Sequence, residues 1–338
     1  MLTVNYQKEK MYKLEQIKDI HLEVTSRCQA RCPMCPRRMQ GGPMMPFVTL
    51  DDINLETFKE WFPVSFIQQL DKVNMCGNLG DPIINTETLD IYKYLREVNP
   101  NIILQMHTNG SARNSAWWQE LASVGVTVVF GIDGLEDTHS RYRINTDFHT
   151  ILVNARTFIK AGGNARWDML VFRHNKHQVE DCRQLASELG FSDFKYKNSS
   201  RFKNGQFNVL DDNGKTIDIL YPTETSESFI KIVEEAKQEI NPTITCKAQN
   251  SHSIYVGANG NIAPCCWLDL EWLPPVSESR IDYMDKIGNF PNLHKHTLQE
   301  IFDSNFFSSI ENTWSNGCLK ECQKQCGKFD KLGAQFES

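Results

Sequence analysis

Short apolar stretches alternate with amphipathic stretches over the first 200 residues of the chain. Six stretches have the length and the β-branched or aromatic content of strands, and they cover residues 17–25, 72–76, 102–108, 126–132, 166–172 and 193–197. Five segments with helical periodicity lie between them, at 51–62, 86–98, 113–124, 147–161 and 177–189, and Asp51 or Asp52 is the predicted N-cap of the first. Such alternation predicts parallel β/α units with right-handed crossovers. Because six units are too few to close an eight-stranded barrel, we expect an α/β fold built on an open, partial (β/α)6 barrel of the TIM type.

The loops after the first four predicted strands carry unusual residues. They contain, in order, three cysteines (Cys28, Cys32, Cys35), the turn-rich segment Gly77-Asn78-Leu79-Gly80-Asp81-Pro82, the segment His107-Thr108-Asn109-Gly110 and the segment Gly131-Ile132-Asp133-Gly134. In β/α barrels the active site lies at the carboxyl ends of the strands. The sequence therefore predicts a functional site where these four loops meet.

The spacing of the first three cysteines also suits one face of a helix, since they stand at i, i+4 and i+7. Pro33 and Pro36 argue against a helix, because proline removes a hydrogen bond and clashes with the preceding turn. We therefore expect a non-helical loop on which the three thiols converge. Thiolates bind soft metal centres, and three ligands for a four-iron cluster leave one iron open.

The second half of the chain contains the other cysteine group. Residues 198–245 are polar and turn-rich, with two short possible strands around an Asp-Asn-Gly turn and a helix at about 225–240, and we interpret them as a bridge. Residues 252–264 alternate around Asn259-Gly260, which predicts a β-hairpin between Cys246 and Cys265-Cys266. An apolar helix near 297–310 precedes Cys318, Cys322 and Cys326.

Two kinds of metal site fit the last three cysteines. Gly317 and Gly327 flank the segment and argue against a helix that carries a buried stripe of thiols. Zinc and iron–sulfur clusters both use closely spaced cysteines. Composition does not separate these two interpretations.

Composition limits the remaining classes. The chain has 338 residues, a formal net charge of −6 and a pI of about 5.9, so no global positive field indicates nucleic-acid binding. It contains no apolar run long enough for a membrane span, and its polar N-terminus predicts a cytoplasmic location. Eleven cysteines, an odd number grouped towards both ends, fit metal sites better than disulfides. A local basic cluster has two interpretations, a solvated loop or an attractor for an anionic cofactor, and comprises Arg27, Arg31, Arg37 and Arg38.

The motif Cys28-x3-Cys32-x2-Cys35 after the first strand of an incomplete barrel resembles the radical S-adenosylmethionine (SAM) superfamily. The resemblance implies that these cysteines hold a [4Fe–4S] cluster whose open iron is chelated by the amino and carboxylate groups of SAM. It also implies that the electron from the reduced cluster cleaves SAM to methionine and a 5′-deoxyadenosyl radical, which removes a hydrogen atom from the substrate. The residues that would contact SAM are Met34, Gly77, Asn78, Gly80, Asp81, Asn109, Asp133 and Arg143.

Four residues in these loops depart from the family's pattern. Met34 stands where an aromatic residue often contacts the adenine, and its thioether offers a substitute surface. Asn78 and Asp81 blur the Gly-Gly-Glu-type motif that holds the methionyl amino group. Gly131 replaces the usual serine and removes a hydroxyl contact.

The C-terminal cysteines resemble the SPASM extension, or its shorter twitch form. Cys246, thirteen residues, Gly260, four residues and Cys265 satisfy the opening pattern. A full SPASM domain has more late cysteines than Cys318, Cys322 and Cys326, so the resemblance favours one auxiliary [4Fe–4S] cluster and leaves a second open. Which of Cys246, Cys265, Cys266, Cys318, Cys322 and Cys326 bind it is also open, with all except Cys266 taken as metal ligands.

The resemblance divides the chain into an extension at 1–16, a barrel at 17–200, a bridge at 201–245 and an auxiliary-cluster domain with a hairpin and helix at 246–338. Electron transfer to the auxiliary cluster would make the reaction an oxidation or a crosslink. Hydrogen donation would make it an epimerisation, with Cys266 or Cys76 as candidate donors, although a small buried side chain is the commoner role of such cysteines. His107, His174 and His177 are acid–base candidates near strand ends, and structural roles are the alternative for each.

The substrate is a peptide or a small molecule such as a sugar, nucleotide or cyclitol. About sixteen residues precede the first strand, fewer than a peptide-recognition domain needs, which counts against a ribosomal peptide. The expected partner is a reductant such as flavodoxin or ferredoxin, without membrane or nucleic acid. A non-catalytic iron–sulfur or zinc protein, acting as an electron carrier or scaffold, is the alternative from another class.

Overall fold

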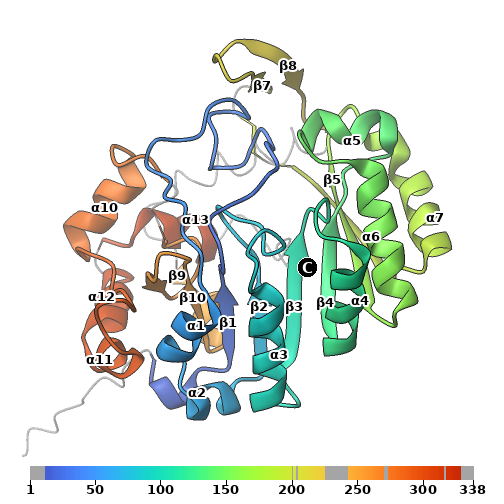
Figure 1. Ribbon diagram of the computed structural model, residues 1–338. Helices are drawn as coiled ribbons and strands as arrows, with labels where there is room; N and C mark the ends of the chain where they lie inside the picture. Colours follow the sequence, from blue (N-terminus) through green and yellow to red (C-terminus); the bar gives the residue numbers. More distant parts are fainter. Residues whose placement is uncertain are drawn as a thin grey trace, which may run out of the picture.

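A computed structural model describes residues 12–199, 201–202, 205–224, 243–269, 273–315 and 317–328. Its main sheet has eight strands in the order β11-β10-β1-β2-β3-β4-β5-β6, and only β10 and β11 pair antiparallel (Figure 1). The strands are β1 (Asp19–Leu22), β2 (Lys72–Met75), β3 (Ile103–Thr108), β4 (Val126–Gly131), β5 (Asn164–Val171), β6 (Asp193–Asn198), β10 (Ser253–Val256) and β11 (Ile262–Ala263). The six predicted strands and the open barrel are confirmed.

Helices cover the outer face of the barrel sheet. They are α1 (Leu55–Trp61), α2 (Val64–Gln69), α3 (Thr88–Val98), α4 (Ser115–Val124), α5 (Glu136–Tyr142), α6 (Phe148–Lys160) and α7 (Val179–Leu189), with 3-10 turns at Leu14–Gln16 and Lys176–Gln178. The strand residues that face the helices are fully buried and apolar, as in β1, where Ile20 and Leu22 alternate with half-buried Asp19 and His21. This alternation leaves a more polar inner face towards the barrel interior.

Three helices of the barrel differ from the sequence prediction, and one of them, α2, follows Pro63, where the sequence predicts no helix. Helix α1 begins after Asn54, whose side chain accepts a hydrogen bond from the Thr57 backbone N–H at 2.8 Å, and not after Asp51 or Asp52. Helix α5 was not predicted, because its seven residues lack an apolar stripe and Glu136 to Tyr142 read as a polar loop.

The predicted C-terminal hairpin forms around Asn259-Gly260, where Gly260 has a φ of +84°. Its strand β10 pairs in parallel with β1, with Ile20 opposite Ile254, so this hairpin extends the barrel sheet. The remaining C-terminal elements are β9 (Thr243–Ile244), α9 (Lys247–Asn250), α10 (Glu278–Lys286), α11 (Leu298–Asp303), α12 (Phe306–Thr313), α13 (Lys320–Cys326) and β12 (Gly327–Lys328).

Helix α13 corrects the expectation that no helix forms between Gly317 and Gly327. The two glycines lie just outside a helix that places Cys322 and Cys326 four residues apart on one face. The predicted apolar helix at 297–310 is interrupted at Ser304-Asn305 and forms α11 and α12. The helix predicted at about 225–240 lies outside the described residues.

The bridging segment forms a hairpin of its own, β7 (Phe207–Leu210) and β8 (Thr216–Leu220). Figure 1 shows it at the end of the barrel where the long loop after β1 also lies. The backbone N–H of Leu210 donates to the Gln40 carbonyl at 2.9 Å, which ties the hairpin to that loop. No helix in the described part of the chain is long and apolar enough to cross a membrane.

Candidate active site

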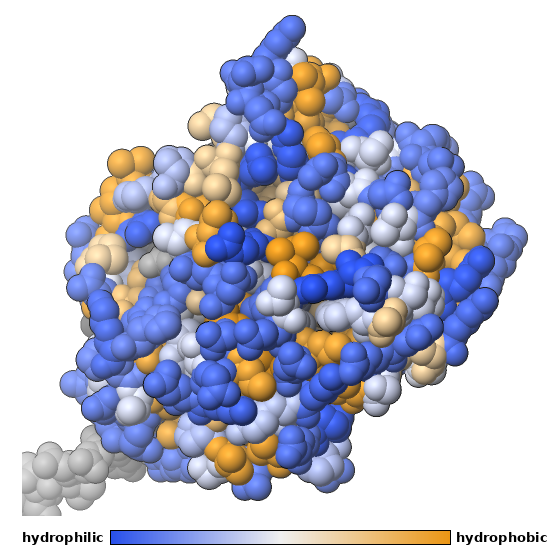
Figure 2. All heavy atoms as spheres, in the orientation of Figure 1, coloured by the Kyte–Doolittle hydropathy of each residue, from blue (hydrophilic) through white to orange (hydrophobic). Residues whose placement is uncertain are grey.

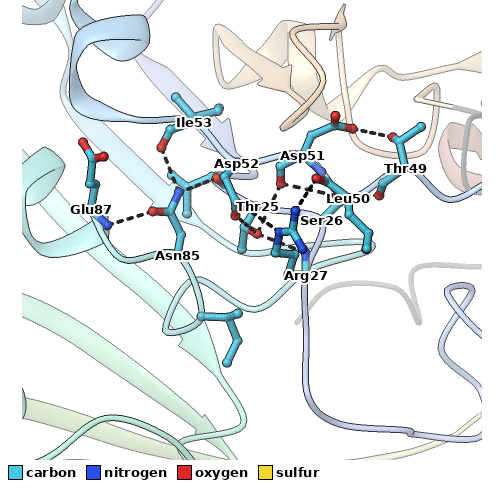
Figure 3. Close-up of polar contacts among 12 residues, drawn as sticks. Thr25, Ser26, Arg27, Thr49, Leu50, Asp51, Asp52, Ile53, Asn85 and Glu87 are labelled. Carbon is cyan, nitrogen blue, oxygen red and sulfur yellow. Dashed lines mark hydrogen bonds and ion pairs between the residues drawn. The ribbon is translucent and has the colours of Figure 1, made fainter.

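The base of the cysteine loop is fixed by a polar network (Figure 3). Ser26 Oγ accepts from the Asp51 backbone N–H at 2.7 Å and donates to the Thr49 carbonyl at 2.7 Å. The Asp52 carboxylate accepts hydrogen bonds from Thr25 Oγ1 at 2.5 Å and from Arg27 Nε at 2.6 Å. These contacts position the chain just before Cys28, and they explain why Asp51 and Asp52 do not cap α1.

The three cysteines of the loop after β1 lie in one apolar cluster. The cluster comprises Ala30, Cys32, Met34, Tyr142, Phe172, Phe202, Val209 and Leu220, with Cys28 and Cys35 packed against it. The loop is non-helical, as predicted, and the Cys35 backbone N–H closes a turn onto the Cys32 carbonyl at 3.0 Å. Burial raises the pKa of the Cys32 thiol to about 11 and raises the pKa of Cys28 as well.

The donor chemistry of this loop fits an iron–sulfur cluster. No trio of His, Cys, Asp or Glu side chains among the described residues stands at metal-coordination geometry, so the fit rests on the donors themselves. All three thiols are free, and they share a buried, largely apolar environment. A cationic metal centre would supply the charge that thiolates need at such a place.

The loop after β2 packs tightly against the cysteine loop. A Cβ atom on Gly80 would lie 1.7 Å from the Thr25 carbonyl oxygen, so only glycine allows this approach. Asp81 is buried, and its carboxylate accepts from Thr108 Oγ1 at 2.8 Å and from the Asn109 backbone N–H at 2.7 Å. Asn109 Nδ2 in turn lies 3.7 Å from Cys28 Sγ. Asp81 therefore joins the loops after β2 and β3 beside the first cysteine.

The loop after β4 brings an arginine to the second cysteine. Arg143 donates from Nε to Asp133 Oδ2 at 2.5 Å, and its NH1 atom lies 3.9 Å from Cys32 Sγ. Asp133 is fully buried, and its other oxygen accepts from the Leu170 backbone N–H at 2.5 Å. A Cβ atom at Gly131 would lie 2.5 Å from Arg143 NH2. The absence of a serine at position 131 thus makes room for the guanidinium.

His139 supports the same loop as a neutral ring. Its Nδ1 accepts from the Asp133 backbone N–H at 3.2 Å, and its Nε2 lies 3.0 Å from Thr146 Oγ1. Burial is the largest cause that lowers the pKa of His139, to about 3, and Arg143 adds to the effect.

Met34 is buried with its sulfur 3.4 Å from Ser199 Oγ.

A second group of cysteines lines a small cavity in the C-terminal module. Its wall contains Cys246, Cys265, Cys322 and Cys326, together with apolar side chains such as Trp267, Ile310 and Trp314. Pairing of β9 with β12 places Gly327 opposite Ile244 and so brings Cys326 beside Cys246. The two thiols hydrogen-bond each other, and Cys246 as donor lowers the pKa of Cys326.

Three further candidate cysteines lie outside this cavity. Cys318 is buried and hydrogen-bonds Cys322 without lining the cavity. Cys266 is likewise absent from the cavity wall, and its carbonyl accepts from Asn78 Nδ2 at 3.1 Å. Burial raises the pKa of Cys76, at the end of β2, to about 12.

The three histidines proposed for acid–base roles have different surroundings. Burial lowers the pKa of His107 to about 4, and its Nε2 lies 3.1 Å from Gln105 Nε2. His174 stacks on Phe172, and burial lowers its pKa to about 4. His177 is exposed on the 3-10 turn after β5.

Two features of the site escaped the sequence analysis. Glu23 is 2% exposed in the segment after β1, and its carboxyl group contacts the Tyr255 hydroxyl, which also contacts Asp269. A charged residue within the apolar run His21–Val24 was the only signal. The β7–β8 hairpin contacts the cysteine loop through Val209 and Leu220, and Asp212 of its turn forms an ion pair with Arg31 at 2.8 Å.

Figure 2 shows the surface in the same orientation, where apolar and polar side chains are mixed and the upper tip is hydrophilic. The exposed apolar residues, among them Ile103, Val153 and Val276, come from separate elements. Scattered exposure of this kind is ordinary for a folded protein. The candidate functional features are therefore the two cysteine groups and the loops between them.

Two family profiles match the chain. The profile of the radical SAM superfamily matches residues 22–186, and the profile of an iron–sulfur cluster-binding domain, SPASM, matches residues 246–327. Both matches include the cysteine group of the corresponding half.

Among curated proteins, the antilisterial bacteriocin subtilosin biosynthesis protein AlbA of Bacillus subtilis is 22% identical over 290 residues, 81% of this chain and 60% of AlbA. A tungsten-containing aldehyde ferredoxin oxidoreductase cofactor-modifying protein of Pyrococcus furiosus is 31% identical over 34% of this chain and 30% of its own. The chain therefore spans less than two thirds of the length of these relatives.

Solved structures share the fold. Streptococcus suis SuiB bound to S-adenosylmethionine matches with a TM-score of 0.58 and 13% identity, over 87% of this chain and 67% of SuiB. The anSMEcpe structure with bound AdoMet matches with a TM-score of 0.55 and 16% identity, over 86% of this chain and 79% of its own.

Proposed function

Because the chain belongs to the radical SAM superfamily and carries a C-terminal SPASM domain, we propose that it is an enzyme that oxidises or crosslinks a peptide. The cofactors of this domain pair are a [4Fe–4S] cluster, SAM and an auxiliary iron–sulfur cluster. When bound and reduced, the [4Fe–4S] cluster would supply the electron that splits SAM into methionine and a 5′-deoxyadenosyl radical. The protein's own residues bind, orient and shield these groups.

The SAM-cleaving site is formed by the loops after β1 to β4. Cys28, Cys32 and Cys35 hold the cluster, and Arg143 pairs with the SAM carboxylate through its remaining N–H groups. Asp81 and Asp133 act as positioning residues, since their carboxylates already hold Asn109 and Arg143. The apolar surroundings exclude water from the reacting atoms.

Further SAM contacts come from the surface between these loops. Met34 contacts the adenine of SAM, and Asn109 lies beside the cluster. The segment Gly77–Gly80 binds the amino group of the methionyl part of SAM. Asn78 turns its side-chain amide towards Cys266, so the backbone of this segment is the part that faces SAM.

The observation that supports the oxidation is the cavity lined by four cysteines. Cys246, Cys265, Cys322 and Cys326 hold the auxiliary cluster, because four thiolates are the usual ligand set. The hairpin that carries Cys265 continues the barrel sheet, so this cavity belongs to the same framework as the radical site. A cluster held by these cysteines would accept one electron from the substrate radical, and loss of a proton from the substrate would complete the two-electron oxidation.

The peptide substrate is supported by the similar proteins. AlbA acts in the biosynthesis of the bacteriocin subtilosin, and structures of SuiB and anSMEcpe contain a precursor peptide or a Cp18Cys peptide. Shared fold and domain order favour a peptide here over a sugar, nucleotide or cyclitol. The reductant is a small electron-transfer protein such as flavodoxin or ferredoxin.

Anaerobic reconstitution, reduction with dithionite and assay for 5′-deoxyadenosine test SAM cleavage. The candidate substrate is the short peptide encoded nearest to this gene, and the reaction is run in deuterated water. A product lighter by two hydrogen atoms supports oxidation or crosslinking. Deuterium gain without that loss would show epimerisation, and clusters that remain intact without 5′-deoxyadenosine would show a non-catalytic protein.

A further inference from the structure

Three buried polar side chains connect the loop after β2 with the C-terminal module. Glu23 Oε1 accepts from the Leu79 backbone N–H at 2.7 Å and faces the Gly80 N–H at 3.5 Å. Its Oε2 lies 3.0 Å from the Tyr255 hydroxyl of β10. The same hydroxyl lies 2.9 Å from Asp269 Oδ2, four residues after Cys265.

These contacts require one proton more than the tyrosine can supply. A tyrosine hydroxyl has a single hydrogen, so it donates to only one of the two carboxyl groups. The other contact is a hydrogen bond only if that carboxyl group itself carries a proton. A neutral Glu23 that donates to Tyr255, which donates to Asp269, satisfies both distances and leaves Oε1 free to accept from Leu79.

The surroundings of Glu23 favour the neutral form. Glu23 is 2% exposed and forms no ion pair with any described lysine, arginine or histidine. Among the described residues, the acids that interact electrostatically with it are Tyr255, Asp269, Cys35, Cys76 and Cys266. Burial, with Asp269 adding to it, raises the pKa of Glu23 to about 8.

A second contact joins the same two segments. Asn78 Nδ2 donates to the Cys266 carbonyl at 3.1 Å, so the loop Gly77–Asp81 is held from the C-terminal module at two points. Within this loop, Asp81 fixes Asn109 and Gly80 approaches Thr25. A shift at Leu79 would therefore reach the cysteine loop.

We propose that Glu23 is a neutral carboxylic acid and that the chain Glu23–Tyr255–Asp269 is a positioning device that makes SAM binding by the loop Gly77–Asp81 depend on the C-terminal module. This inference rests on the proposed function for the role of the loop. Glu23 acts through the Leu79 and Gly80 backbone and does not touch SAM. Ionisation of Glu23 removes the hydrogen bond to Tyr255 and places a negative charge beside Asp269.

Two substitutions at position 23 separate a neutral acid from a carboxylate. Glu23→Gln keeps the accepting oxygen and replaces the acid O–H by an amide N–H, so it reproduces the neutral hydrogen-bond pattern. Glu23→Ala and Tyr255→Phe leave buried groups without partners, and we expect each to weaken SAM binding by roughly tenfold. Glu97→Gln, at an exposed position of α3, is the matched control.

The experiment measures the dissociation constant of SAM for the reconstituted full-length enzyme from below to above pH 8, with cluster content and circular dichroism recorded for each variant. We expect the wild type and Glu97→Gln to lose affinity above pH 8 relative to Glu23→Gln, which should bind as the wild type does at neutral pH. Equal weakening of Glu23→Gln and Glu23→Ala would overturn the neutral acid. Unchanged binding in Glu23→Ala and Tyr255→Phe would overturn the positioning role.

Infrared spectroscopy of the wild type gives a second readout that needs no variant to bind SAM. A protonated-carboxyl band that is present at neutral pH, lost above pH 8 and missing in Glu23→Gln supports the inference, and its absence at neutral pH would overturn it. Because this band does not depend on SAM cleavage, a wild type that shows the band and forms no 5′-deoxyadenosine would refute the proposed function alone.

Discussion

Arg143 and Asp133 form a buried ion pair with 2.5 Å between Nε and Oδ2, beside the sulfur of Cys32. The guanidinium side chain is only 19% exposed, and the carboxylate is fully buried. Burial acts to lower the pKa of Arg143, but Asp133 and Cys32 together raise it, so the guanidinium stays charged. This pair turns a loop arginine into a fixed cation at the edge of the cysteine loop.

Replacing Arg143 by lysine keeps the charge and loses the planar fork. We expect Arg143→Lys to weaken SAM binding and to slow 5′-deoxyadenosine formation by roughly ten- to a hundredfold, because one ammonium cannot hold Asp133 and a carboxylate in the same geometry. The measurement is the dissociation constant of SAM together with the rate of 5′-deoxyadenosine release. Arg141→Lys, in helix α5 two residues before Arg143 and paired with Asp218 at the surface, should change neither quantity. Equal effects of the two substitutions would contradict the role of Arg143.

Local sequence patterns predicted the barrel and the first cysteine group because both depend on short-range order. Strand alternation and the prolines around Cys32 act within a few residues. The set of cysteines around the cavity depends instead on contacts between distant segments, such as the pairing of Gly327 with Ile244. The Glu23–Tyr255 contact likewise spans 232 positions, so nothing near Glu23 in the sequence indicates its partner.

The residues that line the cavity indicate which C-terminal cysteines the protein needs in order to bind iron there. With Cys28, Cys32 and Cys35 intact, the reconstituted wild type should contain about eight irons per chain, because each complete cluster holds four. We expect Cys326→Ala to reduce this to about four, while the variant Cys266→Ala keeps the full content, since Cys266 does not line the cavity. The measurement is iron and sulfide content with the optical spectrum. Iron loss in Cys266→Ala with retention in Cys326→Ala would contradict the assignment.

The variant Cys318→Ala tests the remaining ambiguity in the same group. Cys318 hydrogen-bonds Cys322 outside the cavity wall, so its removal should leave the iron content near that of the wild type. Cys182→Ala, at a buried position of α7, controls for the loss of a thiol unrelated to either group. A drop in iron for Cys318→Ala alone would show that Cys318 replaces one of the four cavity cysteines as a ligand.

Because the buried ring of His139 stays neutral, we expect the folded protein to lose stability in acid. The pKa of His139 falls from the ordinary 6.5 to about 3 in the folded protein. Between pH 6.5 and 3, His139 therefore binds a proton in the unfolded chain and stays neutral in the folded chain. The stability that the neutral ring contributes is present above pH 6.5 and declines as the pH falls towards 3. One pH unit below 6.5 should cost about 1 kcal/mol. Thermal unfolding across this range should be less pH-dependent in His139→Gln than in the wild type.

A matched histidine on α6 serves as the control for this measurement. His149 is 68% exposed and pairs with Glu136 at the surface, so His149→Gln should retain the pH dependence of the wild type. If His139→Gln and the wild type unfold with the same pH dependence, the buried neutral ring is not the source of the effect.

We expect the β7–β8 hairpin to shield the cysteine loop from solvent and oxygen. Val209 is 1% exposed and packs in the apolar cluster that contains Cys32 and Met34, whereas Ile217 on the neighbouring strand is 59% exposed. An aspartate at position 209 would bury an unpaired charge at a cost of several kcal/mol, so the hairpin should detach from the loop rather than accept it. We expect Val209→Asp to speed both proteolysis of the hairpin and bleaching of the cluster by oxygen, with Ile217→Asp close to the wild type. The barrel core does not include Val209, so global unfolding should change little, and this separates loss of the cover from loss of the fold. Equal rates of bleaching in the two variants would show that the cluster is shielded by the barrel loops alone.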